Sequence, residues 1–170
     1  MQKFCKITLI LVIVISFSFT GFAKELKVGF VDVFEVFNEY EKTKDHDAKL
    51  EKKKEEAEKQ LDKKKEEIEK LQGKLSVLKE KEKAREEEKI SKKIEEYREL
   101  ERKSFTDIKK ERDESMQLIV EDIDKIVADY AKKNGYDLIL NENVILYGSK
   151  AMDITDVILK ISNKHYRKSK

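Results

Sequence analysis

The sequence predicts an α+β fold in which a small strand-forming body carries a long antiparallel hairpin of α-helices. The chain has 170 residues, 44% of them charged, and no proline. Such a composition is typical of long, solvent-exposed helices, because compact domains average about 25% charged residues. The charge is concentrated in residues 51–110, where 39 positions are Asp, Glu, Lys or Arg. Strand-like segments stand on both sides of this region and would have to meet, which favours a hairpin.

The first segment is predicted to be a secretory signal peptide, residues 1–23. Lys3 and Lys6 precede an apolar run over residues 7–19, and small residues lead to a cleavage site between Ala23 and Lys24. The run is shorter than the roughly 20 residues of a stable membrane span, so an uncleaved anchor is the weaker alternative. Cleavage would leave a mature chain without cysteine, with 36 basic and 36 acidic residues.

The mature chain is predicted to begin with a buried strand within residues 26–33, which are apolar and β-branched on both faces. Asp32 and Glu35 have the spacing of a helix-capping box, so a helix should follow directly. No glycine or proline interrupts the chain between there and Gly73. We therefore expect this helix to continue without a break into the charged region.

Two heptad-like series predict the helices of the hairpin. The first is Leu50, Lys54, Ala57, Leu61, Lys64, Ile68, Leu71, Leu75 and Leu78. The second is Ile90, Ile94, Tyr97, Glu101, Ser104 or Phe105, Ile108, Arg112, Met116, Ile119, Ile123, Ile126 and Tyr130. The tip is predicted near residues 82–87, although no turn motif marks it and one continuous helix stays an alternative.

The C-terminal part predicts the rest of the body. The second helix should end at Asn134-Gly135, with glycine just past the helix end. Residues 136–140 and 144–147 read as two strands, and a helix should begin at Asp153. The basic tail over residues 164–170 is predicted to fray. The predicted domains are therefore a body formed by residues 24–43 and 131–170, and an arm formed by residues 44–130.

The two ends of the mature chain resemble the Skp (OmpH-like) periplasmic chaperone family. The resemblance lies in residues 27–32 and 34–40 before the charged helices, and in residues 136–140, 144–147 and 153–159 after them. It implies a jellyfish-shaped homotrimer in which body strands of three subunits form one barrel and three hairpins enclose a cavity. It also implies that unfolded outer-membrane proteins are held in that cavity, in the periplasm, before membrane insertion. The candidate trimerisation residues are Val28, Phe30, Val31, Leu138, Leu140, Val144 and Leu146.

The residues are compatible with passive binding. Gly73-Lys74 lacks the remaining residues of a phosphate-binding loop, so no nucleotide is expected to drive release. Many weak contacts in a cavity can hold a disordered client through high effective concentration. The candidate client-contact residues are Tyr97, Phe105, Ile108 and Met116, although each taken singly is explained more simply as holding the hairpin together.

The charge pattern limits the expected partners. A neutral mature chain does not predict the strongly electropositive cavity common in the family, although Arg102, Lys103, Lys109 and Lys110 are candidates for a local basic belt. The basic tail is a candidate for weak contact with anionic lipid or lipopolysaccharide, with a solubilising terminus as the commoner explanation. Neutral charge and export disfavour nucleic-acid binding.

The residue inventory predicts neither an enzyme nor a bound cofactor or metal. Asp45-His46-Asp47 would diverge around a helix and has no second histidine or cysteine in a predictable partner position. The many carboxylates lie on predicted exposed faces, where nothing would shift their pKa toward catalysis. The alternative to a chaperone is a structural or adaptor coiled coil of the envelope, tethered by an uncleaved segment 1–23.

Overall fold

The computed structural model of the chain describes residues 25–170. The predicted signal segment and its cleavage site, Ala23 and Lys24, lie outside the described residues. Within them the elements are β1 (Val28–Val31), α2 (Val33–Glu39), α3 (Glu41–Leu75), α4 (Glu80–Asn134), β2 (Leu138–Asn141), two 3₁₀ turns (Glu142–Val144 and Lys150–Met152) and α5 (Thr155–Ser169). None of the described helices is long and apolar enough to cross a membrane.

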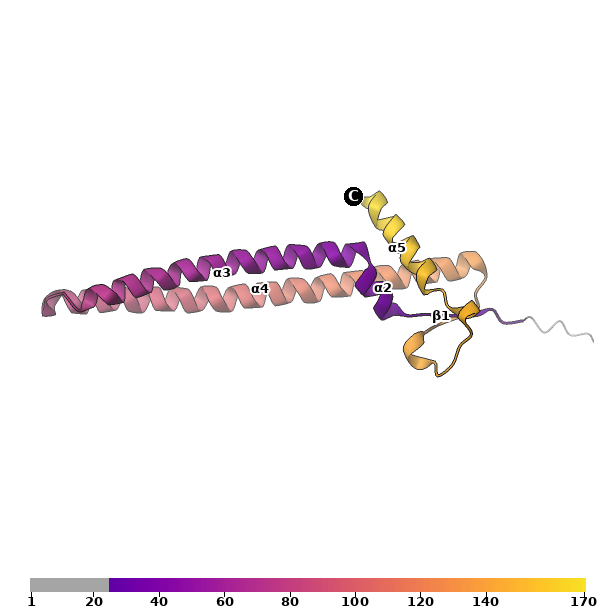
Figure 1. The fold of residues 1–170 in the computed structure, drawn as a ribbon, viewed down its shortest axis with the longest axis horizontal. Coiled ribbons are helices and arrows are strands. Elements are labelled where there is room, and N and C mark those ends of the chain that lie inside the picture. Colours follow the sequence, from indigo (N-terminus) through magenta and orange to yellow (C-terminus); the bar gives the residue numbers. More distant parts are fainter. Residues whose placement is uncertain (1–24) are drawn as a thin grey trace, which may run out of the picture.

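The predicted fold class is confirmed, because a long helical hairpin projects from a small mixed body (Figure 1). Helices α3 and α4 run side by side in opposite directions, and α5 crosses the chain near the root of the arm. The predicted boundaries at residues 43/44 and 130/131 fall inside α3 and α4, so both helices continue from the arm into the body. The division into body and arm stays a prediction.

The sheet of the body consists of β1 and β2, which are parallel and pair Val28 with Leu138 through Val31 with Asn141. On its other edge β1 bridges to Asp153 through Phe30. Gly29 is required by close packing, since a Cβ at this position would lie 2.9 Å from Cε1 of Tyr136. The sheet therefore joins the first described segment of the chain to the segment that follows the arm.

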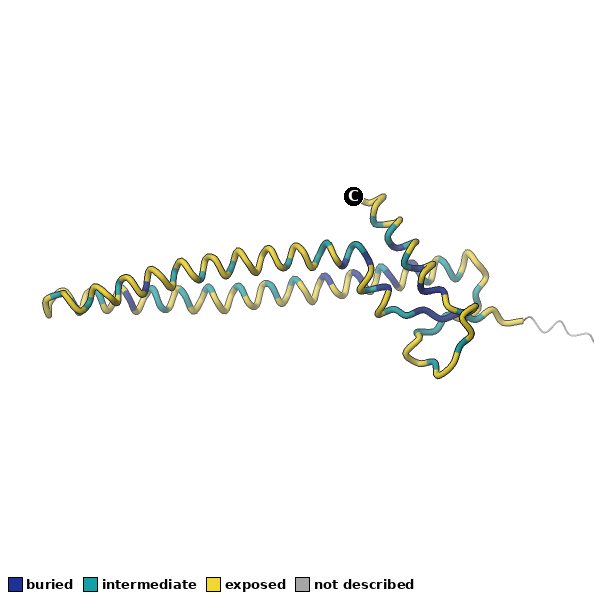
Figure 2. Tube along the Cα trace, viewed as in Figure 1, coloured by how far each residue is buried: buried dark blue, intermediate teal, exposed yellow. Residues whose placement is uncertain are grey.

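The core lies where α2, α4, α5 and β1 converge, and Figure 2 shows the buried residues gathered there. Val36, Tyr40, Ile123 and Ile158 are completely buried within it. Along the arm, by contrast, most residues are exposed and a single line of partly buried positions follows the seam. Burial in the body, more than in the arm, thus supplies the hydrophobic stabilisation of one chain.

The start of the helical region agrees with the predicted cap but not with the predicted continuous helix. The Asp32 carboxylate accepts a hydrogen bond from the Glu35 backbone N–H at 2.9 Å, as the capping spacing indicated. The prediction that this helix runs unbroken into the arm is wrong, because Tyr40 adopts an extended backbone (ψ 126°) between α2 and α3. Burial of the Tyr40 ring against distant residues, rather than a glycine or proline, determines this break.

The tip of the hairpin also differs from the prediction. The turn occupies residues 76–79, before the predicted residues 82–87. The Ser76 hydroxyl donates to the Gly73 carbonyl at 3.0 Å, and Lys79 in an extended conformation begins α4. The turn is therefore built from ordinary side chains without glycine or proline, which is why the sequence did not locate it.

The C-terminal region contains one confirmed helix end and two corrections. Gly135 has φ 69° and ends α4, as predicted. The predicted strand over residues 144–147 is wrong, because a 3₁₀ turn and an irregular loop occupy this stretch. These residues have no neighbouring strand within the chain, so their strand-forming side chains lack a partner. The predicted fraying is also wrong, since α5 continues to Ser169.

Candidate binding surface on the helical hairpin

The seam between α3 and α4 shows which predicted contact residues face the partner helix. In the first series every predicted position except Lys54 is at least partly buried. In the second series Ser104 rather than Phe105 takes the seam position. The prediction that Glu101, Arg112 and Met116 belong to the seam is wrong. The buried or half-buried residues there are Leu100, Glu111 and Ser115. The same spacing of three, four and four residues, from Tyr97 to Ile108 and again from Ile108 to Ile119, causes these shifts.

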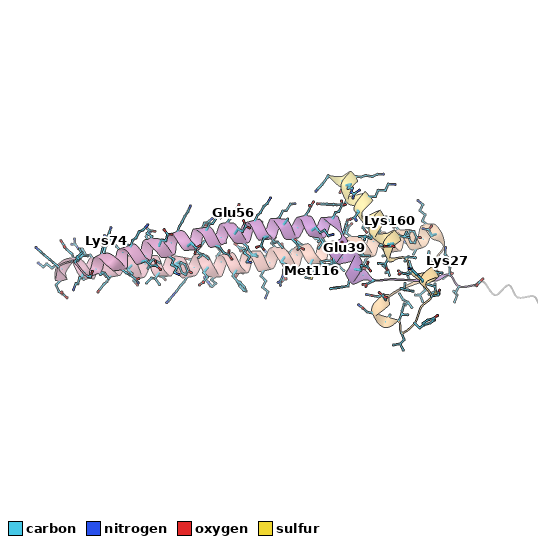
Figure 3. The ribbon with its side chains drawn as sticks, in the orientation of Figure 1. Lys27, Glu39, Glu56, Lys74, Met116 and Lys160 are labelled. Carbon is cyan, nitrogen blue, oxygen red and sulfur yellow. The ribbon has the colours of Figure 1, made fainter. Side chains whose placement is uncertain are left out.

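The four candidate client-contact residues therefore separate into two pairs. Tyr97 and Ile108 are half-buried in the seam. Phe105 and Met116 leave the seam and are 71% and 47% exposed, respectively. Figure 3 shows Met116 near the root of the arm, in the region of Glu39 on α2. Phe105 and Met116 are thus available to an external partner in one chain, whereas Tyr97 and Ile108 mainly hold the helices together.

Ion pairs between the two helices gather on one side of the hairpin. Lys64 Nζ lies 2.9 Å from Glu96, Lys93 Nζ lies 3.3 Å from Glu67, and Lys53 pairs with Glu111. Glu96 is nine residues before Phe105, or about two and a half turns, so these two side chains lie on opposite faces of α4. The ion pairs therefore tie the helices along the side away from Phe105.

The other side of the hairpin contains a series of grooves. The middle groove has a volume of about 490 Å³ and lies between Ala57 and Leu61 of α3 and Phe105 and Ile108 of α4. A distal groove nearer the tip is bordered by Leu75, Ile90, Ile94 and Arg98, among others. A small proximal pocket of about 110 Å³ lies at the root and includes Leu50, Arg112 and Met116. Apolar surface at this side is accessible because residues of mixed size and polarity leave the seam unfilled.

At the root of the arm, a partly buried hydrogen-bond cluster fixes α4 against the start of α3. The Tyr40 hydroxyl donates to Asp122 Oδ2 at 2.8 Å, and Lys42 Nζ lies 3.0 Å from the same oxygen. Burial, followed by the hydrogen bond to Asp122, strongly raises the pKa of Tyr40, so its hydroxyl stays protonated as a donor. The cluster positions the arm on the body.

The C-terminal helix braces the same root from outside. Tyr166 donates to Asp45 Oδ2 at 2.9 Å and packs its ring edge-on against Tyr40, with 6.0 Å between ring centroids. Lys170 also pairs with Asp45, and Arg167 pairs with Glu41. These contacts keep the predicted mobile tail helical. They also occupy Asp45 of the Asp45-His46-Asp47 sequence, and the described residues contain no cluster placed to hold a metal ion.

The candidate trimerisation residues occupy three kinds of environment. Phe30 and Val31 are buried in the core of their own chain, and Val28 and Leu140 are half-buried. Leu138, Val144 and Leu146 are exposed, as is the neighbouring Tyr147. The loop that carries Val144, Leu146 and Tyr147 projects from the body on the side away from α5 (Figure 1). An apolar loop of this kind is a typical protein-interaction surface.

The sequence predicted the apolar residues of the arm surface but not that the two sides of the hairpin differ. The total charge over residues 51–110 combines the side that carries the ion pairs with the side that carries the grooves. The signal was present in the spacing of the charged residues, because helical periodicity of about 3.6 residues assigns each of them to a face.

Comparisons with known proteins identify the family. A family model described as "Outer membrane protein (OmpH-like)" matches residues 27–161. No curated protein matches the chain. A crystal structure of an outer membrane chaperone assigned as OmpH-like, from Caulobacter crescentus CB15, superposes with a TM-score of 0.75 at 11% identity, over 83% of this chain and 86% of that one. Because the family model spans most of the sequence, the chain belongs to the OmpH-like outer membrane protein family.

Proposed function

We propose that this protein is an ATP-independent holdase chaperone of the periplasm that binds unfolded outer-membrane proteins and prevents their aggregation. The observation that carries the proposal is the exposed apolar surface on one side of a long charged arm, in a member of the OmpH-like family. The structural relative from Caulobacter crescentus is itself described as an outer membrane chaperone. The chaperone role is supported by these two findings together.

The charged surface of the arm suits a holdase. Exposed side chains such as Phe105 and Met116 offer apolar contact area, while the surrounding lysines and glutamates keep the arm soluble. Each contact to a flexible client would be weak, and several contacts within one enclosure would raise the effective concentration of the client. Release then requires no nucleotide, because a partner that binds the client more tightly can compete for it.

We propose that the enclosure is formed by a homotrimer. One chain exposes Val144, Leu146 and Tyr147 on a loop of the body and provides a sheet of two strands. A sheet of two strands is only marginally stable by itself, and the open edges of a sheet are usually paired or covered. Association of three bodies would cover both features and place three arms around one cavity.

Lipid contact by the basic tail is a weaker proposal. Arg167 and Lys170 are engaged by Glu41 and Asp45, which leaves Lys164 and Lys168 as the tail cations without an ion pair among the described residues. Binding to anionic vesicles that is abolished by salt and by Lys164→Ala/Lys168→Ala would support this contact. Equal binding by that double variant and the parent would exclude it.

The proposed function is tested by diluting a denatured β-barrel membrane protein into buffer with purified residues 24–170. The expected result is suppression of light scattering at near-stoichiometric concentration, without nucleotide, by a species that sediments as a trimer. A stable monomer without effect on aggregation would contradict the proposal. The mass of the protein isolated from cells distinguishes the holdase from the tethered-adaptor alternative. A mass that includes Met1 would indicate an uncleaved anchor.

A further inference from the structure

A regular stripe of exposed basic and apolar side chains follows the grooved side of α4. Its members are spaced by three or four residues, so they fall on one face of the helix beside the seam. We call it the α4 stripe, and it consists of Arg98, Arg102, Phe105, Lys109, Arg112, Met116 and Val120. All seven side chains are exposed. The stripe contains four cations and no carboxylate, although the mature chain as a whole is neutral.

The α4 stripe borders the grooves rather than the ion-paired side. Arg98 lines the distal groove, Phe105, Lys109 and Arg112 line the middle groove, and Met116 lines the proximal pocket. The described α4 residues that form ion pairs with α3, by contrast, are Lys93, Glu96, Glu111 and Asp122, none of which belongs to the stripe. Cationic and apolar groups are therefore presented together on the accessible side.

The cations of the stripe are largely uncommitted. Within the described residues, Arg98, Arg102 and Lys109 form no ion pair, and Arg112 pairs with the adjacent Asp113. The middle groove also contains Lys54, Glu58 and Glu101, so its lining holds three cations and two carboxylates. The α4 edge of the groove carries Lys109 and Arg112 against one carboxylate, Glu101, so an incoming carboxylate would meet net positive charge next to the Phe105 ring.

We propose that the α4 stripe recognises extended client segments that present both aromatic or aliphatic side chains and carboxylates on one face. This inference rests on the proposed holdase function and names the class of segment that is bound. Residues two apart in an extended strand share a face and lie about 6.6–6.8 Å apart. Steps of three to four residues along α4 rise about 4.5–6 Å, which is close to this spacing, so a client strand laid along the helix can bring carboxylates near the stripe cations and apolar side chains near Phe105 or Met116.

The test uses two labelled peptides, one repeating Tyr-Ser-Asp-Ser and one repeating Tyr-Ser-Lys-Ser, so that tyrosine and the charged residue alternate on one face of an extended strand. Fluorescence anisotropy with the full protein should show about tenfold tighter binding of the aspartate peptide, and the preference should shrink as salt screens the charges. The double substitution Arg102→Glu/Lys109→Glu should weaken binding of the aspartate peptide about tenfold. The matched control, Lys103→Glu/Lys110→Glu, changes the net charge equally on another face of α4 and should stay within about twofold.

A second pair of variants tests the apolar part of the stripe. Phe105→Ala should weaken the aspartate peptide severalfold, whereas Leu118→Ala, which removes a 58% exposed side chain from a different face, should not. All the substituted side chains are exposed, so circular dichroism should show unchanged helix content. Equal losses in the stripe and control variants, or equal binding of the two peptides, would overturn the inference. If the parent protein still suppresses aggregation in that case, the holdase function stands without this specificity.

Discussion

The Tyr40 hydroxyl donates a hydrogen bond to Asp122 Oδ2 at 2.8 Å, joining the break before the first long helix to the return helix 82 positions later. Tyr40 is completely buried, and its extended backbone sets the direction in which α3 leaves the body. This contact, which Lys42 supports on the same carboxylate, therefore ties the start of α3 to α4 beside the apolar core.

Tyr40→Phe should lower the free energy of unfolding by about 1–2 kcal/mol, because it removes the donor and leaves the ring in place. Urea unfolding followed by circular dichroism measures the loss. Tyr97→Phe is the matched control, since the Tyr97 hydroxyl lies on the arm and forms no hydrogen bond among the described residues, and it should change stability by less than about 0.5 kcal/mol. Equal stability of Tyr40→Phe and the parent would show that the hydrogen bond does not secure the root.

Ile123→Ala should destabilise the protein by about 2–5 kcal/mol, because Ile123 is completely buried and the body cannot fully close the resulting cavity. Val77→Ala at the exposed tip is the control and should be nearly neutral. Thermal unfolding at fixed protein concentration makes the comparison, since self-association would link stability to concentration. A similar effect of the two substitutions would place the stabilising core elsewhere.

Acid should weaken the root through Asp122. Burial opposes its ionisation, but hydrogen bonds from Tyr40 and Lys42 and the charge of Lys42 outweigh burial and hold the pKa of Asp122 below its ordinary value. A lowered pKa stabilises the fold above the unfolded value of about 3.9, and this contribution disappears as pH falls through the folded pKa. The unfolding free energy should therefore decrease below about pH 4.

Asp122→Asn tests this assignment, because it removes the titrating group and retains a hydrogen-bond acceptor. The variant should be less stable than the parent at pH 7, and the difference between the two should narrow toward pH 3. Urea unfolding at both pH values measures it. A constant difference across this range would assign the acid sensitivity to other carboxylates, such as Asp45, whose pKa Lys170 and Tyr166 also lower.

Leu146→Glu should dissociate the proposed trimer, because a carboxylate on the exposed apolar loop would have to lose its hydration at the interface. Val77→Glu introduces the same charge at the exposed tip, away from the body, and should leave assembly unchanged. Analytical ultracentrifugation of the parent and the two variants decides between these expectations. A trimer that persists in Leu146→Glu would show that the loop does not join the subunits.

Local rules predicted the elements that depend on neighbouring residues. The Asp32 cap needs Glu35, and the end of α4 needs Gly135, so both were visible in the sequence. The break at Tyr40 was not, because its partner Asp122 is distant in the chain. Residues 144–147 illustrate the converse case, since their strand propensity is real but the described chain offers them no strand to pair with.

The candidate site was predicted in composition but not in arrangement. Phe105 and Met116 were identified from the apolar series, whereas their separation from the seam depended on whether Ser104 and Ser115 took the buried positions. Apolar periodicity favoured Phe105 and Met116 at the seam, whereas packing of α3 against α4 favoured the smaller Ser104 and Ser115. Net charge was similarly misleading, because the balance of 36 basic and 36 acidic residues after position 23 hides the cations collected on the α4 stripe.

Site-specific crosslinking to an unfolded β-barrel membrane protein tests the central claim most directly. Cys5, the one cysteine of the sequence, lies before the predicted cleavage site, so single cysteines at positions 105, 116 and 118 can each carry a photoreactive probe. We predict strong crosslinks from positions 105 and 116, on the grooved side of the arm, and weak crosslinks from position 118. Equal crosslinking at all three positions, or none at any of them, would contradict the account.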